Sequence, residues 1–287
     1  MEIVETINEV REHLARARLR GRVGLVPTMG ALHAGHASLI EAARRACHTV
    51  AVSIFVNPTQ FGPNEDFDRY PRNLRADADL CERLGVDLIF APSTREMYPR
   101  VNRTWVDVEK LSEPLCGARR PGHFRGVTTV CAKLFNIVQP DAAYFGQKDA
   151  QQAIVIRRMV ADLNLPLEIV VCPIVREPDG LAISSRNQYL DAVQRQEATR
   201  LYQALSAARR RFAEGVRETA ALIAAMREVL SQSPTIRVEY VDIVDAETLE
   251  PVASIERPAL AALAAHVGST RLIDNTILDL NDPTASV

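Results

Sequence analysis

Residues 21–56 read GRVGLVPTMGALHAGHASLIEAARRACHTVAVSIFV, and this stretch decides the expected fold. Residues 21–26 are short and apolar and end before Pro27, which predicts a strand that runs into a loop. Residues 36–47 have the composition of a helix, and 49–56 are an uninterrupted apolar run of strand length. Such runs are typical of parallel sheets that are buried on both faces. This strand–helix–strand unit predicts an α/β fold with right-handed crossovers.

The alternation of helix and strand continues beyond this unit. Residues 75–84 predict a helix and 86–90 a buried strand, so 21–90 has the order β-α-β-α-β with short connections. A stripe of apolar side chains over 127–138 predicts a further helix. The same analysis predicts a helix over 3–19, strands over 141–145 and 167–175, and a helix over 149–163.

The pattern changes after residue 175. Residues 191–230 are rich in Ala and Arg and predict two helices, while 236–244 and 259–280 predict strands with turn residues between them. We therefore expect one domain over 1–174 and a second, smaller domain over 175–287.

The composition excludes several classes of protein. The chain has 287 residues, of which 47% are apolar and 24% charged, with 34 Lys and Arg against 36 Asp and Glu. A net charge of −2 gives no general attraction to nucleic acid or to an anionic membrane. No apolar run reaches the roughly 18 residues of a membrane span, and the N-terminus lacks the apolar core of a signal peptide. The five cysteines form no CxxC pair, so we expect buried thiols in a cytoplasmic protein.

Residues 27–36, PTMGALHAGH, place two histidines around a glycine, directly after a predicted strand and before a predicted helix. Unpaired N–H groups at a helix N-terminus favour bound phosphate. Gly30 and Gly35 let a ligand approach the backbone closely. His33 and His36 can donate hydrogen bonds to phosphate oxygens as charge develops in a transition state. The alternative is two histidines in an ordinary loop, which the strand–loop–helix context disfavours.

Three further polar clusters occur near the ends of predicted apolar strands. They are residues 55–62 (FVNPTQFG), 145–152 (FGQKDAQQ) and 183–187 (ISSRN). The amides suit a polar acid, and the lysine, serines and arginine suit phosphate. Each cluster also has a purely structural interpretation, as a pinned loop, a helix cap or a surface charge.

The carboxyl ends of parallel strands meet at one edge of a sheet, so we expect the four clusters to gather there. Together they suit a polyphosphate and a small polar acid. The sequence contains neither a Ser-His-Asp order nor a G-x-x-x-x-G-K-[ST] loop. The residues therefore predict nucleotidyl transfer, with attack on the α-phosphorus of ATP and release of pyrophosphate.

Longer strings of the sequence resemble a known family. PTMGALHAGH, SIFVNPTQFGPNEDF, YPR, GHFRGVTTV, FGQKDAQQ and REPDGLAISSRNQYL together resemble the pantothenate synthetase (pantoate–β-alanine ligase) family, in the family's order. H-x-G-H is similar to the HIGH signature of the class I aminoacyl-tRNA synthetase and nucleotidylyltransferase superfamily. The resemblance implies a Rossmann-like parallel-sheet N-terminal domain and a smaller α+β C-terminal domain that covers the site.

The reaction implied by the resemblance has two steps. The pantoate carboxylate attacks the α-phosphorus of MgATP, which gives an enzyme-bound pantoyl adenylate and pyrophosphate. The amine of β-alanine then attacks the activated carbonyl, which gives pantothenate and AMP. The expected partners are these small molecules, with Mg²⁺ carried on the phosphates, and neither nucleic acid nor membrane. The family also implies a cytoplasmic homodimer.

The resemblance assigns site residues by motif. His36, His33 and Lys148 are the implied catalytic residues. The implied ATP-binding residues are Met29, Gly30, Ala31, Leu32, His33, Ala34, Gly35, His36, Gly146, Gln147, Lys148, Asp149, Val175, Ile183, Ser184, Ser185 and Arg186. The implied residues for pantoate and β-alanine are Gln60, Gln152 and Asn57, with Asn57 near the phosphates.

The chain departs from the family's usual residues at two positions. Ile183 stands where Met is frequent and Gln147 where Glu is frequent. Acidic residues near Asp77 are weak candidates for magnesium contacts, and no protein-only metal site is predicted. An acyl adenylate hydrolyses readily, so we also expect a lid, either residues 64–71 or the C-terminal domain.

Three other functions stay open at this stage. The first is an adenylyltransferase that joins AMP to a phosphate ester, which Phe61, Gly62 and the two glutamines disfavour because they suit an acid acceptor. The second is a tRNA-linked function, which the near-neutral charge disfavours. The third is a regulatory module that binds ATP without turnover.

Overall fold

The computed structural model describes residues 1–63 and 65–281. Asn64, in the expected lid segment, and residues 282–287, in the expected C-terminal domain, lie outside the described residues. Internal contacts divide the chain into two compact units. The N-terminal unit comprises Met1–Glu113, Gly117–Gln147 and Gln152–Pro173, and the C-terminal unit comprises Pro114–Cys116, Lys148–Gln151 and the chain from Ile174 onward.

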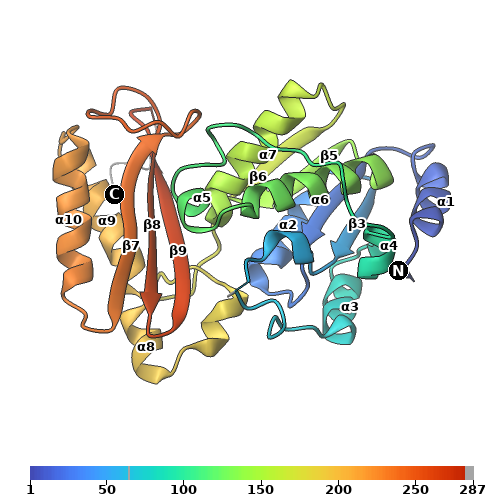
Figure 1. Cartoon of the computed structure of the whole chain (residues 1–287), viewed down its shortest axis with the longest axis horizontal. Helices are drawn as coiled ribbons and strands as arrows, with labels where there is room; N and C mark the ends of the chain where they lie inside the picture. Colours follow the sequence, from blue (N-terminus) through green and yellow to red (C-terminus); the bar gives the residue numbers. More distant parts are fainter. Residues whose placement is uncertain (64, 282–287) are drawn as a thin grey trace. The chain divides into compact units, whose positions relative to one another are not determined.

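A six-stranded parallel sheet forms the centre of the N-terminal unit (Figure 1). Its strands are β1 (Glu2–Val4), β2 (Val23–Thr28), β3 (Thr49–Ile54), β4 (Leu88–Phe90), β5 (Ala142–Gly146) and β6 (Glu168–Cys172). The spatial order is β1-β4-β3-β2-β5-β6, so β2 lies between β3 and β5. The chain runs outward through β3 and β4 on one side of β2, and through β5 and β6 on the other. A ligand-binding crevice is typical of the carboxyl ends of the strands at such a reversal.

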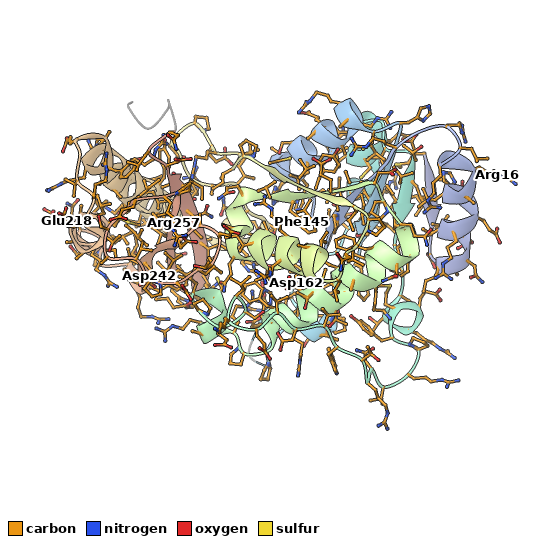
Figure 2. All side chains as sticks on the ribbon, turned by 90° about the horizontal axis from the view of Figure 1, so that it is seen from above. Arg16, Phe145, Asp162, Glu218, Asp242 and Arg257 are labelled. Carbon is orange, nitrogen blue, oxygen red and sulfur yellow. The ribbon has the colours of Figure 1, made fainter. Side chains whose placement is uncertain are left out.

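Helices connect these strands and bury the sheet. They are α1 (Ile7–Ala17), α2 (Ala34–Ala46), α3 (Leu74–Arg83), α4 (Thr94–Met97), α5 (Cys116–Arg119), α6 (His123–Val138) and α7 (Ala150–Asp162). Ile40 and Ala43 of α2 belong to one buried core with Val52 of β3. Figure 2 shows Phe145 of β5 inside the N-terminal unit, whereas Arg16 of α1 points outward.

The predicted helix over 3–19 is wrong at its beginning. Glu2–Val4 forms the edge strand β1, which pairs in parallel with β4. The helix begins only at Ile7, because Thr6 and Glu9 form a capping box that satisfies backbone N–H groups of the first turn. A three-residue strand is too short to show the alternation of apolar and polar residues that predicts a strand. The helical pattern of the following residues therefore extends the predicted helix over it.

The C-terminal unit has a three-stranded antiparallel sheet of β7 (Ile236–Asp245), β8 (Ala259–Val267) and β9 (Thr270–Leu278). Figure 1 shows α9 (Arg200–Ala213) and α10 (Thr219–Ser231) on one side of this sheet. Leu205, Met226 and Leu263 lie in the buried core between these helices and the strands. The short helix α8 (Ala192–Glu197) precedes them. The segment 191–230, for which two helices are predicted, therefore contains three.

The expected fold class is confirmed: a Rossmann-like parallel sheet, and a smaller α+β unit beside it in sequence. All five cysteines are buried free thiols, as expected. In the described part of the chain, no helix is both long and apolar enough to cross a membrane.

The contact between α6 and the 3₁₀ turn η1 (Pro58–Gln60) depends on Gly126. A Cβ at Gly126 would lie 2.4 Å from the Thr59 carbonyl oxygen, well inside van der Waals contact. Gly126→Ala should therefore lower the free energy of unfolding by about 1 to 3 kcal/mol in urea titrations. Asn136→Ala, on the exposed face of the same helix, is the control and should change it by less than about 0.5 kcal/mol. Equal effects of the two substitutions would contradict the close approach.

Candidate active site

The loop between β2 and α2 is held in a fixed, left-handed turn. Gly30 has φ +82° and Ala31 has φ +50°. The Thr28 hydroxyl donates to the Ser53 carbonyl at 2.7 Å and accepts from the Gly30 N–H at 3.2 Å. A Cβ at Gly30 would meet the Asp77 carboxylate at 2.9 Å, so both its conformation and its surroundings favour glycine.

The carboxylate of Asp77, on α3, anchors this loop. Oδ2 accepts from the Ala31 N–H at 3.0 Å and Oδ1 from the Leu32 N–H at 2.7 Å. The residue is 4% exposed. Burial raises the pKa of Asp77, and the two backbone N–H groups oppose that effect by stabilising the carboxylate. Both carboxylate oxygens thus accept hydrogen bonds from the loop, which makes Asp77 a structural anchor.

The two histidines cap helix α2 reciprocally. His33 Nδ1 accepts from the Gly35 N–H at 3.1 Å, and His36 Nδ1 accepts from the His33 N–H at 3.3 Å. Their ring centroids lie 4.1 Å apart. Because each Nδ1 is an acceptor, the neutral rings carry their protons on Nε2. Two imidazole N–H donors are therefore built into the N-terminus of a 13-residue helix, where the dipole also favours an anion.

Gln60 and Asn57 follow β3 and are buried, with exposures of 8% and 1%. Asn57 Nδ2 donates to Gln60 Oε1 at 3.1 Å, and Gln60 Nε2 lies 3.1 Å from Met29 Sδ. Tyr98 Oη donates to Asn57 Oδ1 at 3.0 Å. The amide of Gln60 is thereby held beside the β2–α2 loop, so the structure brings these predicted residues together with Met29.

Two residues without a predicted role fix the backbone of Gln60, and Glu65 of the expected lid segment binds one of them. His123 Nδ1 lies 2.8 Å from the Gln60 carbonyl oxygen, and Arg120 Nη2 donates to the same oxygen at 3.4 Å. Arg120 in turn forms a bidentate pair with Glu65, at 2.7 and 2.6 Å. The GHFRGVTTV string contains His123, but nothing in the sequence indicates a partner 63 residues away.

Gly146 and Gln147 lie at the carboxyl end of β5, which pairs with β2. If a Cβ is placed on Gly146, no described atom lies within 4 Å of it, apart from the two adjacent residues. The backbone at Gly146 therefore leaves space for a ligand. Gln152 is half-buried in the first turn of α7. Met29 and Gly30 also line a cavity of about 310 Å³ with Phe67, Arg72 and Asp77, among others.

The C-terminal unit holds the remaining predicted residues. Lys148 and Asp149 lie in the 3₁₀ turn η2 (Gln147–Asp149). The Ile183 N–H donates to the Val175 carbonyl at 3.0 Å, which closes a hairpin that leads into Ser184. Ser184 Oγ accepts from the Arg186 N–H at 3.3 Å and caps the 3₁₀ helix η3 (Ser185–Tyr189), so Ser184 does cap a helix, as the structural interpretation required. Each unit thus gathers its own set of predicted residues.

Among residues 1–63 and 65–281, no group of three or more His, Cys, Asp and Glu side chains could hold a metal ion.

Comparisons with known proteins agree on one family. The family model for pantoate-beta-alanine ligase matches residues 2–277. The pantothenate synthetase of Moorella thermoacetica is 58% identical over 283 residues, which cover 98% of this chain and 100% of that protein. The pantothenate synthetase of Thermotoga neapolitana is 56% identical over 279 residues, covering 97% of this chain and 100% of that protein.

Solved structures give the same result. The crystal structure of pantothenate synthetase from Thermus thermophilus has a TM-score of 0.92 at 49% identity, and the match covers 96% of this chain and 99% of that one. The crystal structure of pantoate-beta-alanine ligase from Francisella tularensis, complexed with beta-gamma ATP and beta-alanine, has a TM-score of 0.79 at 33% identity. That match covers 96% of this chain and 97% of the other.

The anchoring role of Asp77 can be tested without any substrate. Asp77→Ala should lower the free energy of unfolding by about 1 to 3 kcal/mol, because two backbone donors lose a buried acceptor. Asp77→Asn keeps one acceptor oxygen and should have a smaller effect. Hydrogen exchange of the Ala31 and Leu32 amides should accelerate in both variants, while exchange in β2 changes little. Unchanged exchange at Ala31 and Leu32 would contradict the anchor.

The Arg120–Glu65 pair should make stability depend on pH. Burial alone would raise the pKa of Glu65, but hydrogen bonds and charge from Arg120 outweigh it, so the pKa lies below its ordinary value of 4.5. The pair therefore stabilises the folded state fully above the unfolded-state pKa, and this stabilisation is lost as pH falls through the lower folded-state pKa.

Glu65→Gln should accordingly be less stable than the parent at pH 7 by about 1 to 3 kcal/mol. The difference should shrink progressively below pH 4.5. Asp162→Asn, which breaks an exposed ion pair with Arg158, is the control and should cost less than about 1 kcal/mol at either pH. A Glu65→Gln difference that did not vary between pH 7 and acid would refute this assignment.

Proposed function

The chain belongs to the pantoate-beta-alanine ligase family, and on that premise we propose how its residues divide the work of the reaction. The chain catalyses the ATP-dependent condensation of pantoate with β-alanine, which yields pantothenate, AMP and pyrophosphate. We propose that the reaction passes through an enzyme-bound pantoyl adenylate. The observation that carries this proposal is the pair of Nε2–H donors of His33 and His36 at the N-terminus of α2.

In the first step, the pantoate carboxylate attacks the α-phosphorus of ATP, and the bond to the leaving pyrophosphate breaks. Negative charge grows on the phosphate oxygens in the transition state. The imidazoles of His33 and His36 donate to those oxygens, and the dipole at the N-terminus of α2 also favours the negative charge. The reciprocal caps and the Asp77 anchor hold these donors in position.

Lys148 supplies a full positive charge to the phosphates, and Asp149 binds the ribose. Ser184, Ser185 and Arg186 bind the nucleotide together with Val175 and Ile183. Mg²⁺ enters on the phosphates of ATP and neutralises part of their charge.

Pantoate is held by Gln60, Gln152 and Asn57. The buried side-chain amide of Gln60 is held by Asn57, and His123 and Arg120 hold the backbone carbonyl of the same residue. This amide has donors and acceptors suited to the hydroxyls and carboxylate of a small polar acid. In the second step, the β-alanine amine attacks the acyl carbon, the carbonyl-to-phosphate bond breaks, and AMP departs while the amine loses a proton. We also propose a cytoplasmic homodimer, and a lid that excludes water from the adenylate.

The half-reactions provide the test. MgATP with pantoate alone should release about one pyrophosphate per site, and AMP should appear catalytically only when β-alanine is added. His36→Ala should slow pyrophosphate release about 100-fold or more, since one donor to the developing charge is lost. His48→Ala, an exposed histidine immediately before β3, is the control and should retain the parental rate. Pyrophosphate release that required β-alanine would rule out a free-standing adenylation step.

A further inference from the structure

A buried ion pair in the C-terminal unit lies at the centre of a network that reaches Lys148. Arg176 Nη1 and Nη2 donate to Asp274 Oδ2 and Oδ1 at 2.6 and 2.9 Å. The Asp274 side chain, on β9, is only 2% exposed. A bidentate pair of this kind fixes direction as well as distance, because the planar guanidinium matches both carboxylate oxygens.

Arg176 also orders the hairpin that precedes Ser184. Its Nη1 donates to the Gly180 carbonyl at 3.0 Å, and its guanidinium stacks over the Tyr202 ring at 4.5 Å. Arg176 forms a bridge with Ala182 across the hairpin. Gly180 has φ +93°, and a Cβ there would lie 2.0 Å from the same tyrosine ring. The hairpin is therefore packed closely against its surroundings within this unit.

Asp274 and its neighbour carry the network to Lys148. Asp274 Oδ1 accepts from the backbone N–H of Asn275 at 2.8 Å. The Asn275 side chain, in a residue only 3% exposed, donates from Nδ2 to the Lys148 carbonyl at 2.9 Å. Burial raises the pKa of Asp274, while Arg176, the Asn275 N–H and the charge of Lys148 oppose that effect.

We propose that Asn275, supported by the Arg176–Asp274 pair, is a positioning residue for Lys148 in formation of the adenylate. The lysine side chain is a flexible four-carbon stem, so the point to which its ammonium reaches is set by where its main chain is fixed. Asn275 provides that fixed point from β9. A displacement of about 1 Å at a group that meets the transition state lowers rates by up to about 100-fold, so a tie to the main chain has catalytic consequences. This inference rests on the proposed role of Lys148.

The experiment is a double-mutant cycle on pyrophosphate release with saturating MgATP and pantoate. Asn275→Ala should lower the single-turnover rate constant of pyrophosphate release about tenfold, and Lys148→Ala should lower it more. If Asn275 acts through Lys148, adding Asn275→Ala to Lys148→Ala should reduce the rate by less than about twofold further. Asn275→Ser keeps a shorter donor and should recover part of the loss. The KM for β-alanine in the complete reaction should stay unchanged in Asn275→Ala.

The matched control is Thr219→Val. Thr219 is 6% exposed and lies in the same unit, and its hydroxyl donates to the Val252 carbonyl, which is likewise a tie from a buried side chain to a main-chain oxygen. This variant should keep the single-turnover rate constant of pyrophosphate release within about twofold of the parent, even if its melting temperature falls as far as that of Asn275→Ala. If Asn275→Ala does not fold, Asn275→Ser takes its place in the cycle.

The possible outcomes separate the two proposals. If Lys148→Ala leaves pyrophosphate release unchanged, the proposed role of Lys148 is wrong and the positioning role falls with it. If Lys148→Ala is impaired but the Asn275 variant behaves like Thr219→Val, the positioning role alone is wrong. Losses that multiply in the double variant would also overturn it, because they would show that Asn275 acts independently of Lys148.

Discussion

The left-handed turn at Gly30 and Ala31 is the constraint on which the N-terminal part of the site depends. It turns the chain sharply between β2 and α2, so that the helix begins directly beside the sheet edge. Backbone in this conformation leaves N–H groups that the helix cannot satisfy, and the buried carboxylate of Asp77 accepts two of them. The histidines that follow then cap the helix, and capping fixes their tautomers and hence which ring nitrogen can donate.

The sheet order explains why the other functional groups lie where they do. Because β2 is flanked by β3 and β5, the residues that follow all three strands meet at one edge. The loop after β2 carries the imidazole N–H donors of His33 and His36, and the turn after β3 carries the side-chain amide of Gln60. At the end of β5, the backbone of Gly146 is accessible because no described atom beyond the adjacent residues lies close to it. A parallel sheet with a reversal of strand order therefore brings residues from distant parts of the sequence to one edge.

Sequence patterns predicted what is local and missed what is distant. The apolar runs identified β2, β3 and the parallel sheet, and the PTMGALHAGH string identified the loop, because strand period, glycine and helix start all lie within a few residues. The edge strand β1 is only three residues long, which is too short to show the alternation of apolar and polar residues that predicts a strand. The sequence marks Asp77 only as one of the acidic residues of its segment, since its partners Ala31 and Leu32 are 46 and 45 residues away. Asn275 gave no signal at all, because its contact with Lys148 spans 127 residues.

Each of the two units uses a buried aspartate to hold a segment that lies outside regular secondary structure. In each, a functional segment leaves regular structure, and a buried aspartate holds it: Asp77 holds the histidine loop directly, and Asp274 acts through Arg176 and Asn275. A buried carboxylate is costly unless its oxygens are fully engaged, so its position is specified narrowly by its donors. A carboxylate held in one position by its donors can therefore anchor the segment that binds it.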